Sequence, residues 1–197
     1  MNLNRARGVA ALRGKRWIVV ASIASIAGLW LVAGDEVAAQ TPTAAQQKNI
    51  EQAKARETQA KALLAKYTAA PGRDDSEGLL KEPAVNAELK RVVGNQLPKL
   101  MQNTNVRGAI AYDGGSLVVS GNAPHKGGEE EGVICVNPYS PGLVEAAIFS
   151  RGKITVFATA EKYEYLSLCV KDWITQVNSG HRDRTTQPKN VSVVRAG

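Results

Sequence analysis

The segment of this 197-residue chain that carries the most chemistry is GNAPHKGGEEEG, residues 121–132. It joins two β-prone runs, and its glycines and Pro124 make it the most loop-like part of the sequence. His125 would stand at its tip, where an imidazole can donate or accept a hydrogen bond near neutral pH. We therefore predict a binding loop, with the candidate residues Pro124, His125, Lys126, Glu129, Glu130 and Glu131. The alternative is a plain hairpin loop, whose three glutamates repel one another and stay solvated.

Other patterns of reactive residues are absent from the sequence. One histidine and three carboxylates in a glycine-rich loop would hold calcium only loosely, and their spacing does not match an EF-hand. Two cysteines exclude a four-cysteine zinc site and an iron–sulfur cluster held by one subunit. No phosphate loop, dinucleotide fingerprint or nucleophile elbow appears, and Glu145, Glu161 and Asp172 are not brought together by periodicity. We predict no catalytic residue, no metal and no cofactor, so the protein is expected not to be an enzyme.

Cys135 lies in a β-prone run and Cys169 in a helical stretch, both with apolar neighbours. In an oxidising compartment two such thiols should form a disulfide if their Cα atoms come within about 6 Å. The bond would fix a helix to the sheet.

The amino end has the pattern of an export signal. Five cations in the first 16 residues precede residues 17–33, WIVVASIASIAGLWLVA, which carry no charge. Small residues up to Ala39 predict a signal peptide over residues 1–39, cut before Gln40. The alternative is an uncleaved inner-membrane anchor, although 17 residues reach only about 26 Å. In both cases the remainder faces the periplasm or the exterior.

The exported part reads as one α+β domain with extensions on both sides. We predict an exposed Ala/Gln/Lys-rich helix over residues 40–68, a linker over 69–81, the domain over 82–180 and a basic tail over 181–197. For Val191, Val193 and Val194 in the tail, two alternatives stay open, a short edge strand or a frayed end. This part is mildly basic, and no basic run is interleaved with aromatic residues. We therefore predict no nucleic-acid partner and no membrane contact beyond the amino-terminal segment.

Within the domain, the hydrophobic period changes from helical to alternating and back. It predicts a helix from Glu82 with a break near Gln96 caused by Pro98, an antiparallel sheet of about five strands over 106–158, and a closing helix over 160–180. Tight-turn signals place hairpins around Asp113–Gly115 and Arg151–Gly152. We expect the two helices to cover one face of the sheet, with Trp173 in the core and Lys171 and Asp172 on the wet face.

A small exported sheet with a Pro-His loop resembles the Ivy family of periplasmic inhibitors of C-type lysozyme. The family loop reads Cys-Lys-Pro-His-Asp-Cys, and its histidine enters the lysozyme cleft. The corresponding stretch here is Asn122-Ala123-Pro124-His125-Lys126-Gly127, which keeps Pro and His and lacks both cysteines and the acid. The resemblance covers about residues 106–158. It implies an inhibitor, but a loop without the disulfide ring is expected not to be preorganised and to inhibit more weakly.

Three classes of function follow from these patterns. The first is a non-catalytic periplasmic protein that binds another protein through the loop at 121–132, with lysozyme inhibition as its concrete form. The second is an accessory subunit of an envelope secretion or conjugation assembly, in which the amino-terminal helix is the tether. The third is a periplasmic hydrolase with an active site assembled from scattered residues.

Overall fold

The computed structural model describes residues 42–68, 75–139, 143–178 and 183–196. The predicted signal peptide or anchor, including its apolar run at 17–33, lies outside these ranges. Within them, no helix has both the length and the apolar character that crossing a membrane requires.

One mixed sheet forms the centre of the fold. Its strands follow the order β1-β3-β4-β5-β6-β7, and β2 also pairs with β3. Antiparallel hairpins join β2 to β3 and β5 to β6, as the turn signals predict. The strands span Val106–Arg107 (β1), Ala111–Asp113 (β2), Ser116–Asn122 (β3), Glu130–Val136 (β4), Val144–Ser150 (β5), Lys153–Ala158 (β6) and Val191–Arg195 (β7).

Two features of the sheet differ from the prediction. The first predicted strand is divided into β1 and β2, which lie on the same side of β3. In the predicted basic tail at 181–197, the alternative of a short edge strand is the one observed: residues 191–195 form β7, which pairs with β6 in parallel, whereas the predicted sheet is antiparallel throughout. A helix lies between β6 and β7 and carries the chain back to the end of the sheet at which β6 begins, as a parallel crossover requires. Val191 is buried there, so the apolar residues of this segment belong to the core.

The amino-terminal half of the domain is helical. The break predicted near Gln96 is confirmed: α3 (Pro83–Val93) is followed by a 3-10 turn, η1 (Gly94–Gln96), and by α4 (Leu97–Asn103). Pro98 stands in the first turn of α4, where its missing N–H is tolerated. The predicted linker at 69–81 is wrong for its last six residues, which form α2 (Ser76–Lys81), because Leu79 and Leu80 are buried against the core.

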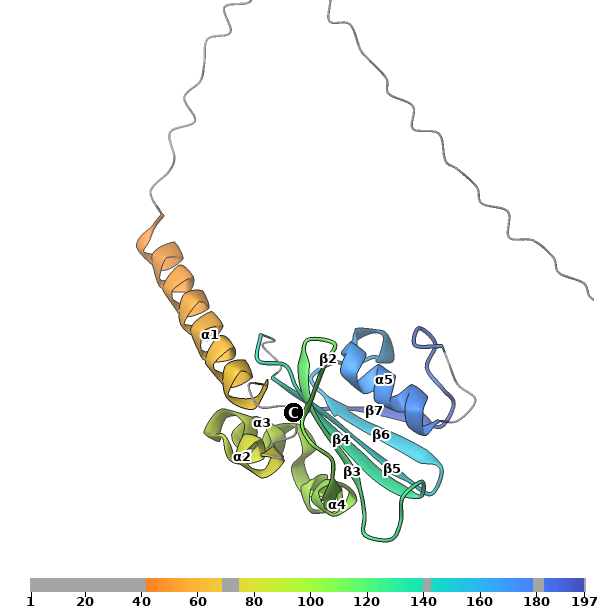
Figure 1. Cartoon of the computed structure of the whole chain (residues 1–197). Coiled ribbons are helices and arrows are strands. Elements are labelled where there is room, and N and C mark those ends of the chain that lie inside the picture. The colour runs from red at the N-terminus through yellow and green to blue at the C-terminus, as the bar shows by residue number, and fades with distance from the viewer. Residues whose placement is uncertain (1–41, 69–74, 140–142, 179–182, 197) are drawn as a thin grey trace, which may run out of the picture. The chain divides into compact units, whose positions relative to one another are not determined.

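The helices cover both faces of the sheet, which corrects the expectation of one covered face (Figure 1). On one face, α2, α3 and α4 pack on alternate strand residues such as Val119 and Ile134. On the other face, α5 (Leu168–Val177) packs on Val133 and Val156. Successive side chains of a strand point to opposite faces of the sheet. The same short strands therefore contribute residues both to the core under α2–α4 and to the core under α5.

The helix α1 (Ala44–Thr68) is exposed over most of its length, as predicted for residues 40–68. Only its carboxyl end docks. Tyr67 is buried in the core of the α2–α4 face, and its hydroxyl donates to Glu82 Oε1 at 2.8 Å. Lys66 Nζ lies 2.5 Å from the same oxygen. The first half of α1 therefore adds length without adding to the core.

The closing helix begins later than its hydrophobic pattern predicts. Tyr163–Tyr165 form a 3-10 turn, η2, and α5 starts after Ser167, whose hydroxyl accepts from Val170 N. Trp173 is buried, as expected. Asp172 is not on a wet face: its side chain is 14% exposed and forms an ion pair with Arg184 at 2.6 Å.

The predicted disulfide is present. Cys135 on β4 and Cys169 on α5 are both buried, their Cα atoms are 6.2 Å apart, and their sulfurs are bonded. The bond joins α5 to the middle of the sheet.

A buried amide links α4 to the sheet. Asn103 has no exposed surface, and its Nδ2 donates to the carbonyls of Phe149 at 3.0 Å and Glu131 at 3.2 Å. Removing it leaves buried carbonyls without these donors, so we expect Asn103→Ala to lower the free energy of unfolding by about 1–3 kcal/mol in urea melts. The exposed neighbour Asn105 is the control. Equal midpoints for Asn103→Ala and Asn105→Ala would contradict this role.

Candidate binding loop

The loop predicted over residues 121–132 is shorter in the structure. Strand β3 continues to Asn122 and β4 begins at Glu130, so the loop comprises residues 123–129. Gly121 and Gly132 face each other in the ladder rather than lending mobility. Their lack of a side chain allows close packing: a Cβ on Gly132 would lie 2.8 Å from Thr104 Cγ2, and one on Gly121 2.4 Å from Val106 O.

The tip of the loop is a tight turn that presents His125. Lys126 N donates to Ala123 O at 3.0 Å, Pro124 occupies the second position, and His125 has a φ of +59°. Pro followed by a residue with positive φ is the arrangement of a type II turn. Histidine is tolerated less well than glycine in this region of backbone space. Pro124 and His125 are both exposed, as a binding tip requires.

Further hydrogen bonds close the base of the loop. Ala123 N donates to Glu130 O at 2.9 Å, and Glu130 N donates to Lys126 O at 2.9 Å. Glu131 Oε1 accepts from Gly128 N at 2.7 Å. The loop has no disulfide ring, and these hydrogen bonds connect its backbone instead.

The three consecutive glutamates have different environments, which corrects the prediction that all of them repel one another and stay solvated. Glu129 is exposed. The Glu130 side chain is 14% exposed, and its carboxylate accepts hydrogen bonds from Lys99 Nζ at 2.6 Å and from Lys126 Nζ at 3.3 Å. The hydrogen bond from Lys99, with a smaller contribution from Lys126, lowers the pKa of Glu130 below the usual carboxyl range. Glu130 is therefore a charged anchor at the loop base.

Asn122 and Gly127 are neighbours across the loop. A Cβ built on Gly127 would lie 3.8 Å from Cγ and from Nδ2 of Asn122. This is ordinary van der Waals contact distance, so the two ends of the turn lie close together.

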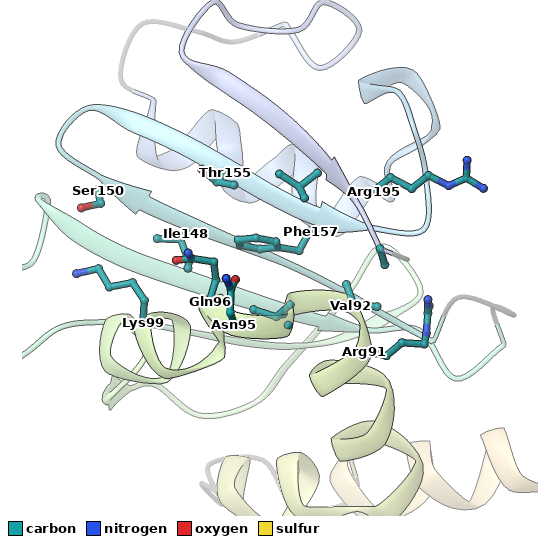
Figure 2. Close-up of a pocket in the computed structure, with 14 residues that line it drawn as sticks. Arg91, Val92, Asn95, Gln96, Lys99, Ile148, Ser150, Thr155, Phe157 and Arg195 are labelled. Carbon is teal, nitrogen blue, oxygen red and sulfur yellow. The ribbon is translucent and has the colours of Figure 1, made fainter.

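Lys99 also lies at the edge of a shallow hollow on the same side of the molecule. The hollow, about 670 Å³, is bounded by α3, η1 and α4 on one side and by β5, β6 and β7 on the other. Figure 2 shows Lys99 at one end and Arg91 and Arg195 at the other, with Phe157 between them. Each of these cations is engaged by a carboxylate: Lys99 by Glu130, Arg91 by Glu88 and Arg195 by Glu161.

The structure brings the predicted binding residues together at one end of the sheet, with two roles. Pro124, His125, Lys126 and Glu129 are exposed on the loop, whereas Glu130 and Glu131 hold its base. Sequence reasoning missed Lys99, which lies 31 residues before Glu130 on a different element. No local motif marks it, because its role arises only when α4 packs beside β4.

Comparison with known proteins places the domain in a family context. The family model Ivy, described as inhibitor of vertebrate lysozyme, matches residues 84–179. This range contains α3 except for its first residue, together with α4, the loop, β1–β6 and α5, so the resemblance inferred from the Pro-His loop is confirmed for the domain. No curated protein and no solved structure gives a significant match.

Proposed function

We propose that this protein is a non-catalytic periplasmic inhibitor of C-type lysozyme, which inserts the turn at Pro124-His125 into the active-site cleft of the enzyme. The observation that carries the proposal is the loop itself within an Ivy-family match: an exposed histidine at the tip of a turn that is closed at its base. The contact of Asn122 with position 127 supports the alignment with the family's six-residue loop.

The chemistry of the tip suits such a target. Lysozymes cleave glycosidic bonds with a pair of carboxyl groups that flank the scissile bond. An imidazole between two carboxyl groups can donate from both ring nitrogens when protonated, and hydrogen bonds between charged partners are the stronger ones. A narrow turn reaches into a cleft that a flat surface cannot enter. Because the turn is already formed, less conformational entropy is lost on binding.

The first experiment is a titration of a C-type lysozyme with the oxidised protein, with lysis of a bacterial cell-wall suspension as the readout. We expect a stoichiometric loss of lytic activity. An undiminished rate at a tenfold molar excess would refute the proposed function.

The exposed half of α1 is expected to be dispensable for inhibition. Deletion of residues 44–58 removes the undocked turns and keeps Tyr67 and its contact with Glu82. Because the deleted turns are exposed and do not pack on the domain, we expect the inhibition constant to change less than about twofold. A change of that size is within the ordinary scatter for a distant alteration. The measurement is the same lysis titration, with full-length protein beside it.

The opposite dependence would favour the second class of function. If deletion of residues 44–58 abolished capture of an envelope complex, and the intact protein left lysozyme active, α1 would be the functional element. An accessory subunit of an envelope assembly would then replace the inhibitor as the proposed function.

A further inference from the structure

We propose that Glu130 is a positioning residue for the binding loop, and that its ion pairs with Lys99 and Lys126 hold the turn in the conformation that binds. This inference rests on the proposed function and assigns to the inhibitory site three residues outside the Pro-His tip, one of them on a different element. The binding partner remains a C-type lysozyme.

Glu130 is fixed by both its backbone and its side chain. Its N–H donates to Lys126 O and its carbonyl accepts from Ala123 N, so the first and the middle residue of the loop both bond to the backbone of Glu130. Its carboxylate uses separate oxygens for the two lysines: Oε2 for Lys99 and Oε1 for Lys126. The side chain thus connects the loop to a helix that does not belong to the hairpin.

Lys99 is a firm point of attachment because the residues of α4 that follow it are anchored in the core and on the sheet. The next residue, Leu100, has no exposed surface and lies in the core of the α2–α4 face. Asn103, one turn later, is hydrogen-bonded to the strands β4 and β5. Lys99 itself is 33% exposed, so water screens its pairing with Glu130 less than it would that of a fully solvated pair.

The ion pairs of Glu130 restrain the same turn that a disulfide ring would restrain. A disulfide between positions 122 and 127 would restrict the same turn, because Asn122 already touches the space that a side chain at 127 would occupy. The present chain has no thiol at either position, so the restraint on the turn comes from its hydrogen bonds and from the ion pairs of Glu130. Lys126, inside the loop, pairs with Glu130 at 3.3 Å.

The test combines loss of the ion pairs with a covalent bypass. We expect Glu130→Gln, which keeps shape and removes charge, to weaken inhibition about three- to tenfold, as partly exposed networked ion pairs do. Adding Asn122→Cys with Gly127→Cys to that variant, oxidised, should return inhibition to within about twofold of the unaltered protein. The non-cross-linkable control carries Asn122→Ser and Gly127→Ser with Glu130→Gln, and should stay weak.

Amide hydrogen exchange of the free protein measures how firmly the loop is held in the absence of lysozyme. In Glu130→Gln the N–H groups of Lys126 and Glu130 should exchange several-fold faster, whereas those of β5 and β6 should not change. The inference is overturned if the loop amides and the inhibition constant are both unaltered, or if the ring fails to restore a weakened inhibitor. If the unaltered protein does not inhibit lysozyme but the loop amides respond as expected, the anchoring role stands and only the proposed target fails.

Discussion

Substitution of His125 by asparagine is expected to reduce inhibition of C-type lysozyme by about 30- to 1,000-fold, the loss typical of removing a central anchor from a protein interface. The reason is that the imidazole is the exposed polar group at the tip of the turn, and no neighbour on the loop supplies a similar one. Asparagine is preferred to alanine as the replacement because it tolerates the positive φ of position 125. The turn is thereby kept while the imidazole is removed. The measurement is the inhibition constant in the lysis assay.

Arg151 offers a matched control for this substitution. It is a second exposed residue with positive φ, 52°, in the tight turn between β5 and β6. Since Glu130 pairs with Ser150 across the strands, this turn lies at the same end of the sheet as the loop. We expect Arg151→Asn to change inhibition less than about threefold, as at most sites outside a hot spot. Equal effects of the two substitutions would show that His125 has no special role.

Loss of the disulfide between Cys135 and Cys169 is expected to cost about 3–4 kcal/mol of the free energy of unfolding, from the chain entropy of a closed loop of about 35 residues. For a domain of this size that corresponds to a fall in melting temperature on the order of 10 °C. The double variant Cys135→Ala, Cys169→Ala and reduction of the unaltered protein should give falls of similar size in calorimetry. Both cysteines are buried, so the variant also loses some packing and should be the less stable of the two.

Two controls isolate the covalent bond. Adding reductant to the double variant should not change its melting temperature, because no bond remains to be reduced. The loop is held by contacts with α4 rather than with α5, so below its own melting temperature the variant should still inhibit lysozyme. A reduced protein as stable as the oxidised one would show that the bond contributes nothing to stability.

Local patterns were sufficient to predict most of the secondary structure and the helix break. Runs such as residues 144–150 are short, β-prone and bounded by turn residues, and Pro98 interrupts a helix wherever that helix packs. The disulfide was also predictable, because only two cysteines are present in the whole chain. Residues 76–81 were misassigned because Gly78 and the preceding polar stretch resemble a linker, whereas burial of Leu79 and Leu80 makes the segment helical.

The sequence by itself determined the class of domain, the pairing of Cys135 with Cys169 and the position of the Pro-His turn, since each depends on residues that are close in the chain or unique in it. Tertiary structure decided which face each helix covers, the parallel addition of β7 and the attachment of Glu130 to Lys99. These features join residues far apart in the chain, such as Asn190 and Gly152, which are 38 positions apart and meet at the start of β7. Neither partner carries a local signal of such a contact, because the free energy that selects it arises only when the separate elements pack together.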